Sequence, residues 1–141
     1  MIPNDKHEEV DPKLDEIATG VVDSAYQVHA VLGPGLLENS YEACLVHTLM
    51  KYGHKVERQV PMPLEYDGVK LDVGYRIDLL VDGELIVEVK AVESILPIHV
   101  AQIMTYMKLM KKPLGLLINF NETYFKRSVK RVVLTRSEKN E

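Results

Sequence analysis

The sequence has little of several residue types that mark specialised classes of protein. It contains one cysteine, Cys44, no tryptophan and two phenylalanines among 141 residues. A lone cysteine cannot form an internal disulfide. The opening segment MIPNDKHEEV is polar and acidic, whereas a secretory signal needs a basic patch followed by an apolar stretch. No apolar run approaches the roughly 20 residues that span a bilayer. These absences predict a soluble, cytoplasmic protein without a membrane partner.

An excess of basic residues is also missing. The chain has 17 Lys and Arg residues against 21 Asp and Glu residues, which gives a formal net charge of −4. Phosphate-dominated binding normally needs a basic face, so this balance argues against an extended grip on nucleic acid. It does not exclude a nuclease, because carboxylates that hold a metal count as negative in the sequence but are neutralised in the working site.

What is present fits one globular domain. The hydrophobic fraction of 46% and the charged fraction of 27% are ordinary for such a domain, and the length suits a single core. We expect residues 11–136 to form this domain. The polar segments 1–10 and 137–141 are expected to be flexible tails.

Hydrophobic periodicity predicts three helices and seven strands in the order ααβββββαββ. Apolar residues recur at helical spacing from Asp11-Pro12 to Gly33-Pro34, and again from Leu37 to Gly53. The third expected helix is 97–110, and the expected strands are 56–60, 63–66, 69–73, 75–81, 85–90, 113–120 and 128–134. This order predicts an α/β fold.

Two neighbouring strands carry four charged residues, Arg76, Asp78, Glu88 and Lys90, in otherwise apolar surroundings. Alternation along the fifth strand sets Glu88 and Lys90 on one face. On the preceding strand, alternation sets Asp78 on the face opposite to Ile77 and Leu79. A carboxylate and an amine therefore project together, with a second carboxylate nearby in the sequence.

The turn between these strands decides whether the two carboxylates meet. A two-residue turn at Asp82-Gly83 would place Asp78 opposite Val87 and send Glu88 to the other face. A three-residue loop, with Gly83 in the left-handed conformation of a bulge, makes Asp78 and Glu88 near neighbours on one face. The functional interpretation requires the three-residue loop.

Two carboxylates close together on an apolar surface repel each other and need a positive partner. Mg²⁺ or Mn²⁺ is one solution, because both prefer oxygen ligands and bridge to phosphate oxygens. An ordinary cross-strand ion pair with Lys90 or Arg76 is the alternative. If Asp78, Glu88 and Lys90 stood alone, the ion pair would be the better interpretation, because an E-x-K on a strand is common.

Two further motifs accompany the hairpin. The segment 35–41, GLLENSY, matches the pattern GxxExxY, and the segment 102–106, QIMTY, matches the QxxxY that follows the E-x-K strand in RecB-type nucleases. With its motifs in this order, the chain resembles the GxxExxY family of the PD-(D/E)XK nuclease superfamily over nearly the whole domain. The proline of the superfamily's name is Ile77 here, while the acid, Asp78, is in place.

The resemblance implies a restriction-endonuclease-like core, with a mixed central sheet flanked by helices. It also implies a metal centre that binds Mg²⁺ or Mn²⁺. Asp78 and Glu88 would be the metal ligands, helped by the backbone carbonyl of Val89, and Glu38 would supply a further carboxylate.

The remaining motif residues receive roles around this centre. The resemblance implies that Lys90 orients or activates the attacking water, and that Gln102 and Tyr106, which share one helical face, help to order the site. Two simpler interpretations stay open. Glu38 could be an acid favoured by the helix dipole, and Tyr41 could be an aromatic residue of the core.

The function implied is metal-dependent hydrolysis of phosphodiester bonds, in DNA rather than RNA. The alternative is a catalytically silent, nuclease-like module that binds nucleic acid or a protein partner. A homodimer could supply the binding surface that so small a chain lacks.

Overall fold

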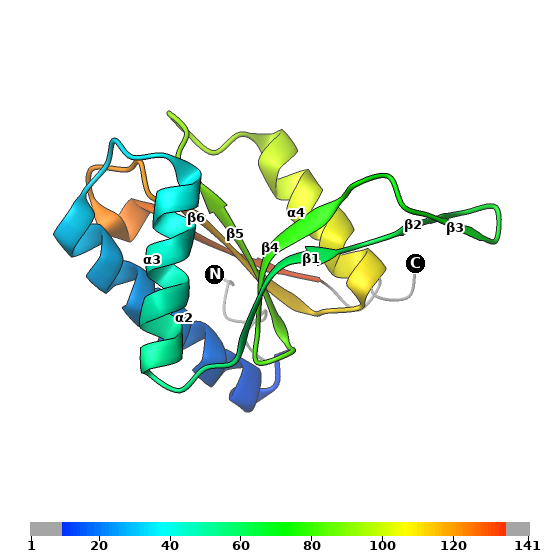
Figure 1. Cartoon of the computed structure of the whole chain (residues 1–141), viewed down its shortest axis with the longest axis horizontal. Helices are drawn as coiled ribbons and strands as arrows, with labels where there is room; N and C mark the ends of the chain where they lie inside the picture. Colours follow the sequence, from blue (N-terminus) through cyan, green and yellow to red (C-terminus); the bar gives the residue numbers. More distant parts are fainter. Residues whose placement is uncertain (1–9, 135–141) are drawn as a thin grey trace, which may run out of the picture.

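A computed structural model describes residues 10–134, which form a mixed sheet with helices on both faces (Figure 1). The helices are α2 (Pro12–Leu32), α3 (Glu38–Lys51), α4 (Pro97–Met110) and the short 3₁₀ helix η1 (Phe125–Arg127). The strands are β1 (Val56–Pro61), β2 (Leu64–Tyr66), β3 (Val69–Leu71), β4 (Arg76–Val81), β5 (Leu85–Lys90), β6 (Leu114–Asn119) and β7 (Val129–Val133). The expected order of helices and strands is confirmed, and η1 is added to it.

The expected tails fall almost entirely outside the described residues. Val10, the last residue of the expected N-terminal tail, is described and is buried in the core. Within residues 10–134, no helix combines the length and the apolar character that a membrane span requires.

The five-stranded sheet has the order β1-β4-β5-β6-β7. β5 and β6 are parallel, and the other neighbours are antiparallel. Parallel neighbours need a crossover connection, and α4 supplies it between β5 and β6. β6 is buried along its whole length, as the sequence predicts for a strand covered on both faces. This mixed sheet confirms the restriction-endonuclease-like fold class.

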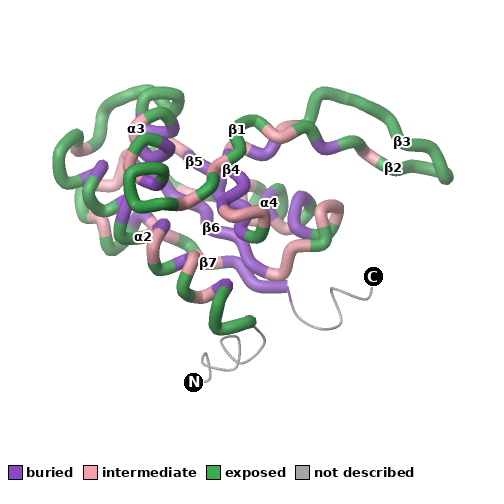
Figure 2. Tube along the Cα trace, turned by 60° about the horizontal axis from the view of Figure 1, so that its bottom comes forward, coloured by how far each residue is buried: buried purple, intermediate pink, exposed green. Residues whose placement is uncertain are grey.

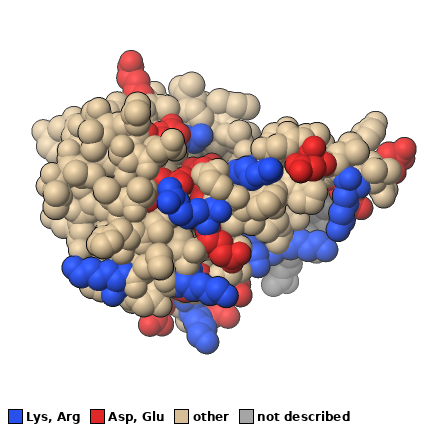
Figure 3. Space-filling view, viewed as in Figure 1, with Lys and Arg blue, Asp and Glu red and all other residues tan. Residues whose placement is uncertain are grey.

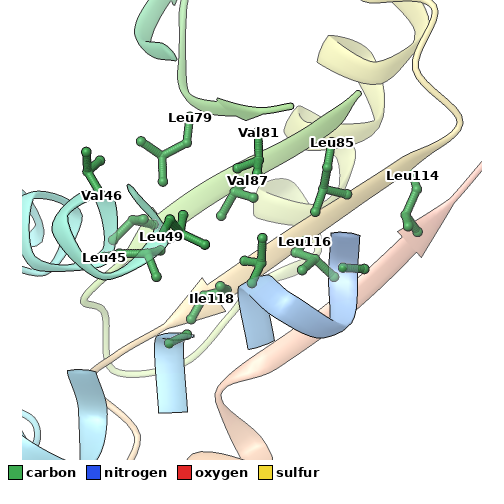
Figure 4. Packing of buried hydrophobic residues seen from close by; sticks show 14 of the residues in the cluster. Leu45, Val46, Leu49, Leu79, Val81, Leu85, Val87, Leu114, Leu116 and Ile118 are labelled. Carbon is green, nitrogen blue, oxygen red and sulfur yellow. The ribbon is translucent and has the colours of Figure 1, made fainter. Parts of the chain in front are cut away.

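Helices α2 and α3 cover one face of the sheet, and α4 covers the other. Leu45 and Leu49 of α3 lie against the sheet residues Leu79 and Val87 (Figure 4). On the opposite face, α4 packs closely on β6 at Gly115, where an added Cβ would lie 2.9 Å from the Met107 sulfur. The sheet therefore holds α3 and α4 at fixed positions on opposite sides of β4 and β5.

β2 and β3 form a separate two-stranded sheet, which we call the arm (residues 64–71). Asp67 and Gly68 at its tip have φ angles of 54° and 75°, which suit a tight hairpin turn. The arm projects from the body of the protein and is mostly exposed (Figures 1 and 2). At its base, the Met62 amide donates to the Tyr75 carbonyl at 3.0 Å. The sequence predicts both strands but not their separation from the main sheet.

Candidate active site

The loop between β4 and β5 has three residues, as the functional interpretation requires. Val81 pairs with Leu85, so residues 82–84 form the loop. Asp82 and Gly83 both have left-handed φ angles, 53° and 70°, and the Glu84 amide donates to the Val81 carbonyl at 3.0 Å. The predicted loop length is confirmed, although the left-handed conformation extends to Asp82 as well as Gly83.

The side chains of Asp78 and Glu88 are fixed by hydrogen bonds from backbone amides of the neighbouring strand. The Asp78 amide donates to Glu88 Oε1 at 3.0 Å, and the Val89 amide donates to Asp78 Oδ2 at 2.9 Å. The paired register of β4 and β5 begins only at Leu79 and Val87. The two strands thus separate at the acids, and each carboxylate accepts a backbone N–H of the opposite strand. This reciprocal arrangement fixes both carboxylates side by side.

The regular alternation of β4 breaks at Asp78. Leu79 packs toward α2 and α3, whereas Ile77 packs into the cluster beneath α4. The expectation that Ile77 and Leu79 share a face is therefore wrong. The physical reason is a local irregularity, because Gln59 of β1 has a φ of 50° and is missing from the register at the position opposite Asp78.

A third carboxylate, Glu42 of α3, lies close to this pair. Its side chain is buried, and its Oε2 accepts bonds from Arg58 Nη2 at 2.9 Å and Arg58 Nε at 3.2 Å. The Gln59 amide group donates to Glu42 Oε1 at 2.9 Å and to Asp78 Oδ1 at 3.3 Å. Gln59 therefore bridges α3 to the hairpin, and Arg58 compensates the buried charge of Glu42.

Sequence reasoning missed Glu42, although one signal was available. Glu42 lies three residues before Leu45 and seven before Leu49, and so on the buried face of α3. A charged residue at a core position of an amphipathic helix needs a partner. Gln59 carried no comparable signal, because glutamine has no special preference for positive φ.

Burial dominates the electrostatics of the pair. Burial and, after it, the charge of Asp78 raise the pKa of Glu88, the Asp78 amide and Lys90 act in the opposite direction, and the net pKa is about 8. Burial also raises the pKa of Asp78, and the charge of Glu42 adds to this, against the bond from Val89. Without a cation, Glu88 therefore retains its proton at neutral pH.

An ordinary ion pair does not account for these carboxylates. Arg76 pairs with Asp72 at 3.6 Å. In the described part of the chain, neither Arg76 nor Lys90 forms an ion pair with Asp78 or Glu88. Lys90 is near enough to lower the pKa of both acids without contacting them as a salt bridge. The described residues therefore do not support the ion-pair interpretation of Asp78 and Glu88.

A carboxylate pair suits a divalent cation of the magnesium type. Mg²⁺ is usually held by one or two carboxylates and keeps several waters that phosphate oxygens can replace. Over residues 10–134, no three Asp, Glu, His or Cys side chains converge into a metal-binding set. Asp78 and Glu88 are thus the side chains that could bind the cation. The expected role of the Val89 carbonyl as a further metal ligand stays a prediction.

Glu38 lies at the end of β5. Its side chain is exposed in the first turn of α3, and its Oε2 accepts the Ala91 amide at 3.3 Å. Ala91 follows Lys90, so the fold brings Glu38 to the end of the strand that carries the lysine. Its role as a metal ligand remains a prediction.

Tyr41 belongs to the core. Its ring stacks on Phe120, with centroids 4.7 Å apart and an interplanar angle of 7°. Its hydroxyl donates to the Gly33 carbonyl at 2.5 Å and accepts the Leu36 amide at 3.1 Å. These contacts fix the loop between α2 and α3, and they support the simpler of the two interpretations of this residue.

Gln102 and Tyr106 reach the site from α4. Burial raises the pKa of the Tyr106 phenol, and the nearby charges of Glu88, Tyr75 and Asp78 add to this effect. The Gln102 side chain hydrogen-bonds to the phenol and acts against the shift. Tyr106 thus lies near the acids and Gln102 lies beside Tyr106, while the role of both residues in ordering a catalytic site stays a prediction.

A further residue, Asn119, holds the chain that follows Lys90. This asparagine is fully buried at the end of β6. Its Oδ1 accepts the Val92 amide at 3.0 Å, and its Nδ2 donates to the Val92 carbonyl at 2.9 Å. The Phe120 amide also donates to the Lys90 carbonyl at 2.9 Å. These hydrogen bonds fix the backbone at the end of β5, where Lys90 lies.

Acidic and basic side chains are interleaved on the face that contains this region. Figure 3 shows both signs of charge near the middle of the face, between the positions of α3 and α4. No broad basic surface covers this face, which agrees with the negative formal charge of the chain.

Comparison with known proteins gave one match. The family model described as the PD-(D/E)XK nuclease superfamily matches residues 15–132. No curated protein and no solved structure matches the chain. The matched segment includes the β4–β5 hairpin together with α3 and α4.

Proposed function

The chain belongs to the PD-(D/E)XK nuclease superfamily, and from this we propose that it hydrolyses phosphodiester bonds of nucleic acid with the help of Mg²⁺ or Mn²⁺. The observation that carries the proposal is the reciprocal pair of Asp78 and Glu88. The buried carboxylate of Glu88 and the half-buried carboxylate of Asp78 are held side by side by backbone bonds, and both pKa values are raised. Such a pair is stabilised by a bound cation.

The residues around the pair suit hydrolysis at a phosphate. Asp78 and Glu88 would hold the cation, which supplies an activated water and stabilises charge on the phosphate oxygens when bound. Lys90 projects beside them without a salt-bridge partner among residues 10–134. Its ammonium can donate to the attacking water or to a phosphate oxygen.

The surrounding shell would keep these groups in place. Glu42 and Gln59 restrain Asp78 from the side of α3, and Tyr106 packs near both acids from α4. We also propose that Glu38 and the Val89 carbonyl assist the cation. The motifs at 35–41 and 102–106 support membership of the GxxExxY branch, and DNA is the proposed substrate.

A cleavage assay tests this proposal. Labelled DNA and RNA, single-stranded and duplex, are incubated with the chain in Mg²⁺, Mn²⁺ or EDTA. We expect cleavage only with a divalent cation. Asp78→Asn and Lys90→Ala should each lower the rate on the order of 100-fold, because each removes a group of the centre.

Asp72→Asn is the matched control, since Asp72 is an exposed acid at the base of the arm that contacts only Arg76 and its own turn. Its rate should equal that of the wild type. Cleavage that survives EDTA, or that survives both site substitutions, contradicts the proposal. Absence of cleavage on every substrate would favour a silent binding module.

A further inference from the structure

An apolar groove of about 320 Å³ lies beside the carboxylates, between α4 and the base of the arm. Leu64 of β2 and the connecting residues Met62 and Tyr75 line it on one side, and Ile98 lines it from the start of α4. Tyr75 is 42% exposed and Ile98 is 67% exposed. Together they make a hollow apolar surface that the fold does not fill.

This groove shares two of its lining residues with the candidate active site. Gln102 and Tyr106 line it, and the Tyr106 phenol is close enough to Glu88 and Asp78 for their charges to raise its pKa. The rings of Tyr75 and Tyr106 lie 6.3 Å apart at an angle of 51°. A ligand in the groove would therefore contact an aromatic wall directly beside the acids.

The lining identifies the chemistry of the ligand. Among residues 10–134, no Asp, Glu, Lys or Arg side chain lines the groove, so the described lining suits an uncharged, planar group and not a phosphate. Thr105 donates its hydroxyl to the Ala101 carbonyl at 3.0 Å, and His99 Nδ1 accepts the Leu96 amide at 2.9 Å. Gln102 and the hydroxyls of Tyr75 and Tyr106 are the other polar groups of a mostly apolar lining. Recognition therefore rests mainly on stacking and apolar contact, which every base can provide.

We propose that the groove holds one unpaired nucleobase of a strand whose phosphate backbone passes the Asp78–Glu88 pair. This inference rests on the proposed function and adds the substrate class: single-stranded nucleic acid, or an unpaired end, with little sequence preference. A base inside a duplex is stacked and paired, so it cannot enter the groove without being extruded.

Strand binding by two groove variants and one control tests the proposal. Tyr75→Ala and Ile98→Ala remove exposed walls of the groove, and Tyr66→Ala removes an aromatic ring, 71% exposed, from the arm outside the groove. All are made in a Lys90→Ala chain so that the probe stays intact. The probes are a short labelled DNA strand, the same sequence as RNA, and the blunt DNA duplex, each titrated in Mg²⁺.

We expect Tyr75→Ala to weaken single-strand binding by roughly 10-fold through loss of one base–aromatic stack. Ile98→Ala should weaken it less, and Tyr66→Ala should leave it unchanged. The duplex should bind more weakly and show no dependence on Tyr75. Thermal unfolding checks each variant, and Ile98→Ala keeps the test valid if Tyr75→Ala fails to fold.

The possible outcomes distinguish a failure of the groove proposal from a failure of the proposed nuclease function. Equal strand affinities for the Tyr75, Ile98 and Tyr66 variants overturn the groove, even if Mg²⁺-dependent cleavage depends on Asp78. Strand binding that depends on Tyr75 but comes without cleavage supports the groove and rejects the nuclease. A chain that binds no strand contradicts both.

Discussion

Glu88 is the residue whose chemistry is most altered by the fold. It is 6% exposed, it accepts the Asp78 amide, and its pKa of about 8 lies well above the ordinary value of 4.5. Between these two values, the folded chain keeps a proton that the unfolded chain has already released. Folding is therefore progressively disfavoured as the pH rises through this window.

Glu88→Gln should remove this pH dependence. In EDTA, the free energy of unfolding of the wild type should fall between about pH 5 and about pH 8, by a few kcal/mol at most. The variant should lose less over the same interval, since glutamine does not titrate and its oxygen can still accept the Asp78 amide. Urea unfolding at several pH values measures the difference.

Glu84→Gln provides the control for this comparison, because Glu84 is an exposed acid in the adjacent loop. It should follow the wild type at every pH. Parallel curves for the wild type and Glu88→Gln would show that Glu88 has an ordinary pKa.

Some individual residues of the candidate site could be predicted from the sequence. Asp78, Glu88 and Lys90 could be brought together from strand alternation once the loop was given three residues. Gln59 could not be foreseen, because its contacts depend on a left-handed backbone at a residue type that rarely adopts one. The break of alternation at Ile77 has the same origin.

At the scale of elements, local signals predicted the helices well. Asp11 Oδ1 accepts the Lys13 amide at 2.8 Å as the helix cap that the Asp-Pro pair suggests. The third helix has the expected bounds, Pro97–Met110. Such ends are set by neighbouring residues, so they can be predicted from the sequence alone.

The pairing of the strands was harder to predict from the sequence than the bounds of the helices. β1 pairs with β4 and skips the two strands between them, which form the arm. Short strands separated by turns are equally compatible with a meander in one sheet. The separation of the arm depends on long-range pairing that no local pattern records.

The arm should be dispensable for folding. Leu64 pairs with Leu71, so residues 65–70, all exposed, can be replaced by an Asn-Gly turn that closes a shorter hairpin. The melting temperature should change by less than about 5 °C, because little apolar surface is lost from the core. Calorimetry on the shortened chain measures this.

The shortened chain retains Leu64 and Tyr75 of the groove, so its strand binding should also persist. Loss of a cooperative transition would mean that the arm belongs to the folding unit. Replacing residues 65–70 by an unrelated six-residue hairpin provides a control for the insertion itself.

At the scale of the whole molecule, the site is made by bringing three layers together. Glu42 comes from the helix on one face of the sheet, Tyr106 from the helix on the other, and Asp78 and Glu88 from the strands between them. The motif order in the sequence indicated the fold and the strand residues. It did not indicate Glu42 or the groove, because both depend on how the layers pack.

The whole molecule has a formal charge of −4, which opposes the approach of a phosphate. At the candidate centre, Arg58 compensates the charge of Glu42, and the raised pKa of Glu88 favours its neutral form. A cation at Asp78 and Glu88 reverses the local sign. If the proposed centre holds a cation, we expect cation binding to strengthen substrate binding, so that the two binding events are coupled.

Proton release on cation binding is the most direct test of the Asp78–Glu88 centre. Near neutral pH, Mn²⁺ is titrated calorimetrically into the wild type in buffers of different ionisation enthalpy. We predict release of about one proton, because Glu88 must lose its proton to become a ligand. Glu88→Gln should bind more weakly and release almost none, and Asp72→Asn should match the wild type. Mn²⁺ binding without proton release, or with equal affinity in Glu88→Gln, would contradict a cation centre at this pair.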